Sequence, residues 1–181
     1  DAITMNFAGY NIVIEHRAGT IRRGVDKNGN PWERELTCHY GYLEATEGID
    51  GENIDVFIVP NPNDSDELTY WSCHVVDQVK PDTAAFDEHK LILNAADIED
   101  AKRSYLSNYP EDWKGLGAIA ELSGLMLSEW LKRMNWRGLP YSLNYTSPIE
   151  DRPNAQGESG AYDKTVDPVC PDCGTAYEWG G

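Results

Sequence analysis

The chain has 181 residues, of which 40% are hydrophobic and 10% aromatic, which predicts one folded domain of ordinary size with its own core. Its formal net charge of −16 disfavours nucleic acid as a partner, because no basic face is left to displace counterions. No apolar run approaches the ~18 residues of a membrane-spanning helix, so we expect no membrane partner. Four cysteines are too few for a disulfide scaffold and favour a reducing cytosol.

Strand patterns fill the first half of the chain. Segments rich in β-branched and aromatic residues, separated by turn signals, predict strands at residues 10–19, 40–46, 55–60, 69–79 and 89–94. The Asn-Gly pair within "DKNGN", residues 26–30, predicts a hairpin turn. The chain begins at Asp1 rather than at a methionine, so we expect a fragment or a processed product.

Helical patterns follow the strands. "NAADIEDAKRSYLSNYP" predicts a helix with Asn94 as its N-cap and Pro110 just past its end, and "ELSGLMLSEWLKRM" predicts a second helix. Strands followed by helices indicate an α+β fold, with a small antiparallel sheet or barrel packed by two helices. We expect the domain at residues 1–141 and an extended polar tail at 142–181, where Pro, Gly and Ser accumulate.

Three carboxylates lie close together immediately before an apolar strand. Asp50, Glu52 and Asp55 form the pattern D-x-E-x-x-D, and residues two apart in an extended segment face the same way. Carboxylates that converge repel one another unless a cation neutralises them, and Mg²⁺ suits such a site. The apolar residues that follow exclude an EF-hand, which needs a longer ligand loop. An acidic turn without a ligand explains the spacing equally well, and both interpretations stay open.

Two further charged groups complete a set typical of phosphoryl chemistry. Arginines suit bidentate contacts with phosphate. Acids for metal, cations for phosphate and tyrosine donors together indicate phosphoryl transfer or hydrolysis. The first group surrounds the start of the predicted strand at 89–94 and comprises Asp82, Asp87, Glu88 and Lys90. The second group lies near the N-terminus and comprises Arg17, Arg22, Arg23 and Arg34.

"CHYGYLEATEGIDGENIDVFIVP" resembles the central signature of soluble family I inorganic pyrophosphatases: a Tyr-Gly-Tyr strand, a turn, and D-x-D-x-x-D before an apolar strand. The flanking segments "IVIEHRAG", "IRRGVDKNG", "EHKLIL" and "YLSNYP" resemble the family in the same order. "FDEHK" and "YPEDWKGLGAI" look closest to the pyrophosphatase-like domains of phage and mobile-element multi-domain proteins. The resemblance covers residues 10–133. It implies a five-stranded OB-like antiparallel β-barrel flanked by two or more helices.

The resemblance also implies an activity, the hydrolysis of pyrophosphate or a related small diphosphate to two phosphates with several Mg²⁺ ions. Its implied catalytic residues are Asp50, Glu52, Asp55 and Tyr40. Metal binding is implied for the first three of these, for Glu15, and for Glu88 or alternatively the pair Asp82 and Asp87. Phosphate contacts are implied for Arg22, Arg34, Lys90, Tyr40 and Tyr109, with Lys114 as a substitute for the family's second lysine, whose position Pro110 occupies.

Two departures from the family sustain an alternative. Glu52 stands where the family has Asp, and Pro110 stands where it has Lys. A catalytically weakened structural module of a phage virion or capsid is therefore the rival hypothesis. Under the rival hypothesis the partners are phage structural proteins and the location is the virion. Under the enzyme hypothesis the location is the cytoplasm, which is that of the host if a phage encodes the chain. A homo-oligomer is also open. The physiological diphosphate and the oligomeric state stay open.

The C-terminal "CPDCG" at residues 170–174 is half of a zinc knuckle. Zinc takes four ligands, and Cys170 and Cys173 supply only two. Cys38–His39 or Cys73–His74 complete the site only if the tail folds back, and a second chain is the other source.

We expect the tryptophans Trp32, Trp71, Trp113 and Trp130 in the core.

Overall fold

The structure of the protein, a computed structural model, describes residues 3–44, 53–63, 67–132 and 141. These residues form nine strands and two helices. In chain order the elements are β1 (Ile3–Phe7), β2 (Tyr10–His16), β3 (Ile21–Val25), β4 (Pro31–Glu35), β5 (His39–Leu43), β6 (Ile54–Ile58), β7 (Cys73–Val79), β8 (Phe86–Leu93), α1 (Ile98–Leu106), β9 (Leu116–Glu121) and α2 (Gly124–Leu131).

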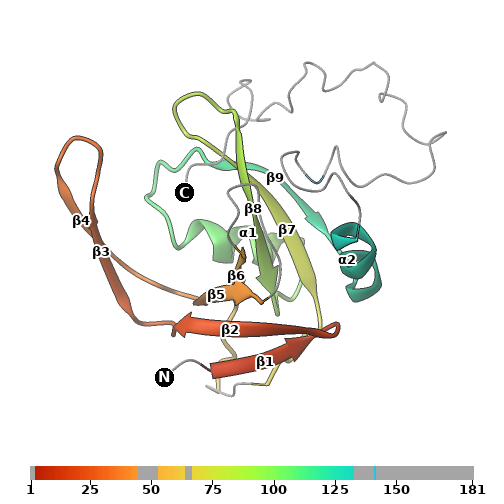
Figure 1. The fold of residues 1–181 in the computed structure, drawn as a ribbon. Helices are drawn as coiled ribbons and strands as arrows, with labels where there is room; N and C mark the ends of the chain where they lie inside the picture. The colour runs from red at the N-terminus through yellow and green to blue at the C-terminus, as the bar shows by residue number, and fades with distance from the viewer. Residues whose placement is uncertain (1–2, 45–52, 64–66, 133–140, 142–181) are drawn as a thin grey trace, which may run out of the picture.

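Seven of the strands form one mixed sheet in the order β1-β2-β5-β6-β8-β7-β9. Neighbouring strands run antiparallel except β6 and β8, which are parallel. The other two strands, β3 and β4, form a separate hairpin that projects from the sheet (Figure 1). The predicted turn at 26–30 closes this hairpin, with a hydrogen bond of 2.8 Å from Asp26 N to Asn30 O and with Gly29 at a φ of 85°.

The expected five-stranded OB-like antiparallel barrel, and with it the α+β class, is wrong. The fold of the described residues is mostly β, its main sheet has seven strands with one parallel pair, and the end strands β1 and β9 are not neighbours. Hydrophobic alternation marks a segment as a strand, but it does not say which distant strand will lie beside it. The sequence therefore predicted five of the strands and missed how they pair, and it missed β1 and β9.

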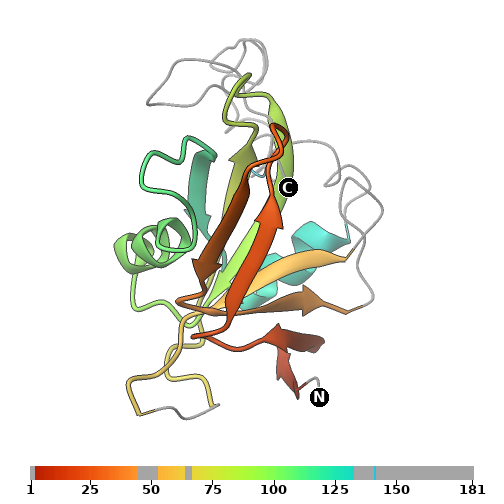
Figure 2. The same cartoon turned by 90° about the vertical axis from the view of Figure 1, so that its left-hand side faces the viewer.

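Helices cover the two faces of the sheet. On β6, Ile54, Val56 and Ile58 point to one face and join a core that includes Trp130 of α2. Phe57 points to the other face and joins a core that includes Tyr105 of α1. Figure 2 shows the two helices on opposite sides of the strands. Because side chains alternate along a strand, Asp55 shares the α1 face with Phe57.

Both helices begin at a polar cap, one of them later than predicted. The side chain of Asp97 accepts a hydrogen bond from Asp100 N and caps α1, and Ser123 caps α2. Asn94, the expected cap, has a φ of 69°, and its Nδ2 donates to Val59 O at 2.8 Å. Neither helix in the described residues has the length and apolar character needed to cross a membrane.

The expectation of four core tryptophans is only partly confirmed. Trp130 is fully buried and Trp113 is half-buried. Trp32 and Trp71 are 43% and 66% exposed. Trp71 stacks with Phe7 at the edge of the sheet, with ring centroids 6.2 Å apart.

Candidate active site

Three strands bring Tyr40, Asp55 and Lys90 together on the α1 face of the sheet. Asp55 of β6 is in register with Lys90 of β8, and Tyr40 lies on β5, the other neighbour of β6. Asp55 Oδ2 accepts hydrogen bonds from Tyr40 Oη and from Lys90 Nζ, each at 2.6 Å. Lys90 Nζ also lies 3.2 Å from Glu88 Oε2. We refer to Tyr40, Asp55, Glu88 and Lys90 as the Asp55 centre.

The charge of Lys90 holds the Asp55 centre together. The Lys90 side chain is buried, whereas that of Asp55 is 28% exposed. Burial by itself would lower the pKa of Lys90, but the surrounding tyrosine and carboxylate groups raise this pKa well above its usual value. Lys90 therefore stays charged at neutral pH between two carboxylates. Burial also raises the pKa of Tyr40, so its hydroxyl remains a hydrogen-bond donor.

The Tyr-Gly-Tyr sequence of β5 is explained by the close approach of β2. A Cβ atom at Gly41 would lie 1.8 Å from the carbonyl oxygen of Val13, so only glycine allows the two backbones to pair. The register of β2 on β5 skips Glu15, which is exposed at this bulge. Bulges re-aim side chains and occur often beside active sites. Glu15 thus lies next to the strand that carries Tyr40.

A second polar group, which we call the tyrosine network, consists of Gln78, Tyr105, Tyr109 and Trp113. Gln78 Oε1 accepts a hydrogen bond from Tyr105 Oη at 2.6 Å and one from Tyr109 Oη at 3.0 Å. Trp113 Nε1 donates to Tyr105 Oη at 3.0 Å. Burial raises the pKa of Tyr109 to about 12, so its hydroxyl is protonated at neutral pH.

The sequence predicted a phosphate contact for Tyr109, which stays a prediction, and it did not single out Gln78. Gln78 lies in a strand in which all seven residues are buried. Its only sequence signal was an amide within a run of residues that favour strands. Such a residue must find hydrogen-bond partners when it is buried, but the sequence does not reveal which ones.

Two arginines face each other across the β3–β4 hairpin. Arg22 and Arg34 are register partners, and like charges directly opposite each other destabilise a pair of strands. Within the described part of the chain, neither arginine forms an ion pair with a carboxylate. The guanidinium of Arg22 lies 5.2 Å from the centroid of the Tyr40 ring, so this face of the hairpin adjoins the Asp55 centre. An anion bound here would relieve the repulsion.

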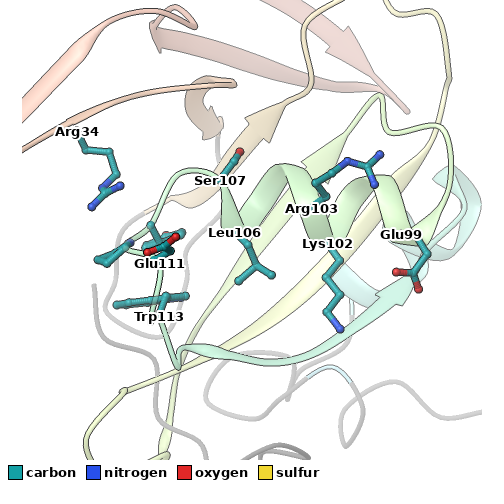
Figure 3. Close-up of a pocket in the computed structure, with 10 residues that line it drawn as sticks. Arg34, Glu99, Lys102, Arg103, Leu106, Ser107, Glu111 and Trp113 are labelled. Carbon is teal, nitrogen blue, oxygen red and sulfur yellow. The ribbon is translucent and has the colours of Figure 1, made fainter.

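An open groove of about 820 Å³ runs along α1 and is bordered by Arg34 and Tyr109. Figure 3 shows Arg34 reaching toward Glu111 and Trp113, while Lys102 lies farther along the helix. The groove carries cations and carboxylates, and it gives solvent a path to Arg34 and Tyr109.

The remaining predicted acids differ in their surroundings. Asp82 is exposed, and its Oδ2 lies 3.8 Å from Lys27 Nζ at the tip of the hairpin. Asp87 is half-buried, and its Oδ2 has no hydrogen-bond partner among the described residues. Burial, followed by the negative charge of Glu88, raises the pKa of Asp87 to about 7. Asp87 therefore adjoins the Asp55 centre, whereas Asp82 faces the hairpin tip. Lys114 is exposed between α1 and β9.

Asp50 and Glu52 lie outside the described residues, and so do Cys170 and Cys173. Within the described ranges no three acids, histidines or cysteines are grouped as metal ligands. The oxygens of Asp55 and Glu88, which converge on Lys90, and the unpartnered Oδ2 of Asp87 are nevertheless the donor type that Mg²⁺ prefers. The residues that are described fit the magnesium ions expected from the sequence.

Cys38 and Cys73 are both buried free thiols. Burial raises the pKa of Cys38 to about 11 and also raises that of Cys73. Zinc binds the thiolate form of cysteine, so these environments are unfavourable for completing a zinc site with the C-terminal knuckle.

An aspartate clamped by a lysine and a tyrosine, beside an arginine pair and a tyrosine network, defines a candidate site for phosphate esters or anhydrides. The family model of inorganic pyrophosphatase matches residues 2–132. The chain belongs to the inorganic pyrophosphatase family, which supports a pyrophosphatase-like function. Searches of curated proteins and of solved structures give no match.

Proposed function

We propose that this protein hydrolyses inorganic pyrophosphate, or a related small diphosphate, to two phosphates with the help of Mg²⁺. The observation that carries the proposal is the juxtaposition of the Asp55 centre with Arg22, which contacts the ring of Tyr40 from a hairpin whose arginines oppose each other. The two arginines suit a ligand that bears several negative charges, and the neighbouring carboxylates suit the metal ions that bind to such a ligand.

Magnesium would be held by carboxylates from two segments. Asp55 and Glu88 lie in the described centre, and Asp87 adjoins it. Asp50 and Glu52, which precede Asp55 by five and three positions in the D-x-E-x-x-D pattern, would add ligands from the segment before β6. Bound Mg²⁺ neutralises phosphate oxygens and lowers the pKa of water.

The chain's own groups divide the remaining work. Arg22, Arg34 and Tyr109 bind phosphate oxygens. Lys90, which has N–H donors beyond the one it gives to Asp55, stabilises the negative charge that accumulates on the departing phosphate, and Tyr40 would contribute by transferring its hydroxyl proton from Asp55 to a phosphate oxygen. A water oxygen bonds to phosphorus as the bridging P–O bond breaks, and Glu52 accepts the proton released by the water.

The test is phosphate release from pyrophosphate with Mg²⁺, comparing the parent protein with Asp55→Asn. We expect the variant to lose activity by about 100-fold or more, the scale on which one charge-stabilising group acts in an active site. Glu129→Gln, an exposed carboxyl-to-amide change on α2, is the matched control and should keep parental activity. A parent without magnesium-dependent release would refute the enzyme and leave the phage structural module as the better hypothesis. Equal rates in the parent and in Asp55→Asn would show that Asp55 is not required.

The domain division remains part of this proposal. We assign the catalytic unit to residues 1–141 and the polar tail, with its half of a zinc knuckle, to residues 142–181, which lie outside the described residues. A cytoplasmic location, in the host if the chain is phage-encoded, suits pyrophosphate as the substrate, and a virion suits the rival structural module.

A further inference from the structure

Gln78 links the tyrosine network to the Asp55 centre. It is fully buried on β7 and is in register with Glu88, while Val76, two residues earlier on the same face, is in register with Lys90. Its Oε1 accepts hydrogen bonds from the hydroxyl groups of Tyr105 and Tyr109, and on β8 its side chain partly offsets the burial and the Glu88 charge that raise the pKa of Asp87 to about 7. One amide thus contacts α1, the segment after α1, and β8.

The two hydroxyl groups use the full accepting capacity of Gln78 Oε1. A carbonyl oxygen has two lone pairs, and each tyrosine has a single hydroxyl proton. While Tyr109 donates to Gln78, it therefore cannot donate to phosphate, so substrate binding must transfer this hydrogen bond from Gln78 to a phosphate oxygen. Gln78 does not become unsatisfied when that happens, because the shorter bond from Tyr105 remains.

The surroundings fix both tyrosines at this acceptor. Tyr105 is fully buried and also accepts from Trp113 Nε1. The ring of Tyr109 stacks on Trp113, with centroids 4.4 Å apart, and meets Phe57 at an angle of 71°. With the ring held by packing, the acceptor decides where the hydroxyl proton of Tyr109 points.

We propose that Gln78 is a positioning residue that holds the hydroxyl of Tyr109 on its own carbonyl oxygen until phosphate displaces it, so that Gln78 sets the cost of phosphate binding. This inference rests on the proposed function, in which Tyr109 binds phosphate. Gln78 does not touch the substrate and acts through Tyr109 alone. Tyr105 shares the same acceptor but has no part in binding.

A double-mutant cycle on the full chain tests the proposal. Gln78→Met keeps the length of the side chain and removes the acceptor. We expect it to tighten binding of inorganic phosphate with Mg²⁺, measured by calorimetry, and to lower the KM for pyrophosphate, each by about 10-fold, with kcat changed less than about threefold, because Tyr109 then has no hydrogen bond to give up. Tyr109→Phe should weaken phosphate binding by about 10-fold, and adding Gln78→Met to Tyr109→Phe should change the affinity no further.

Tyr105→Phe is the matched control, because it removes the other donor to Gln78 and also perturbs the buried network. It should leave phosphate affinity and KM at parental values. Thermal unfolding is measured for every variant. If Gln78→Met does not fold, Gln78→Asn replaces it; this change withdraws the acceptor by one methylene and should give a smaller gain in affinity in the same cycle.

Each outcome decides the proposal. A loss of affinity in Gln78→Met, an effect of Gln78→Met that persists in the Tyr109→Phe background, or an equal gain in Tyr105→Phe would overturn the role of Gln78 even if the parent hydrolyses pyrophosphate. A parent that binds phosphate without hydrolysing pyrophosphate would refute the proposed function, and a non-additive cycle in phosphate binding would still support Gln78. A parent that binds no phosphate would overturn both.

Discussion

At the scale of single residues, the site depends on a buried lysine between two carboxylates. Lys90 Nζ lies 2.6 Å from Asp55 Oδ2 and 3.2 Å from Glu88 Oε2. Taking charges out of water is costly, and the pair stabilises the fold only because each charge has a partner. Removing the lysine would leave two like charges at close range.

We predict that Lys90→Met lowers the free energy of unfolding of the metal-free protein by about 3 kcal/mol, the low end of the range for breaking a buried pair, because Asp55 is partly exposed. Urea denaturation measures the change. Lys27→Met removes an exposed partner of Asp82 and should change stability by less than about 1 kcal/mol. Similar losses in both variants would mean that Lys90 is not a structural charge.

At the scale of elements, the contact between β2 and β5 places Tyr40. Gly41 allows the carbonyl of Val13 to approach, and the same pairing carries Glu15 at its bulge. β6 then continues the sheet and brings Asp55 beside Tyr40. One glycine therefore affects both the stability of the sheet and the geometry of the Asp55 centre.

We predict that Gly41→Ala destabilises the protein by about 3 kcal/mol or more, because the added Cβ meets backbone that can move only if β2 separates from β5. Gly124→Ala is the control: its Cβ would meet Ala8 Cβ at 3.3 Å, and alanine favours the helix that starts there. Chemical denaturation should show a change within about 1 kcal/mol for the control. An equally stable Gly41→Ala would contradict the predicted clash.

At the scale of the whole molecule, both faces of the sheet are buried, and this creates buried histidines. His74 is 1% exposed on β7, and neither of its ring nitrogens has a hydrogen-bond partner among the described residues. Burial lowers the pKa of His74, although the charges of Glu121, Asp97 and Asp100 act in the opposite direction. The folded protein therefore accepts this proton less readily than the unfolded chain does.

We predict that this difference makes the fold sensitive to acid. Above about pH 6.5, the ordinary pKa of histidine, His74 costs nothing; as the pH falls through that value, the unfolded chain binds the proton first and stability declines. Thermal unfolding between pH 7.5 and 5 should show a shallower decline for His74→Leu than for the parent. His16→Leu, at a less buried position on β2, is the control. Equal slopes for the parent and His74→Leu would refute the role of His74.

Local features of the fold could be predicted from the sequence, whereas features that depend on tertiary contacts could not. The strand segments, the Asn-Gly turn and two helices could be predicted because local periodicity and turn chemistry report them. The α1 cap was placed at Asn94 instead of Asp97, since both residues are good caps and only the tertiary contacts of Asn94 with Val59 separate them. Trp32 was expected in the core, but it belongs to a projecting hairpin.

By itself, the sequence determined which family the chain belongs to and which residues are candidates for its chemistry. Tyr40, Asp55 and Lys90 were predicted from motifs, because short patterns of charged and aromatic residues record chemical requirements directly. Only the tertiary structure decided that these three share a face with Gln78, and that the sheet is open and mixed rather than a barrel. The physical reason is that strand pairing depends on burial against distant partners, so neither the parallel contact of β6 with β8 nor the acceptor of Tyr109 appears in any local pattern.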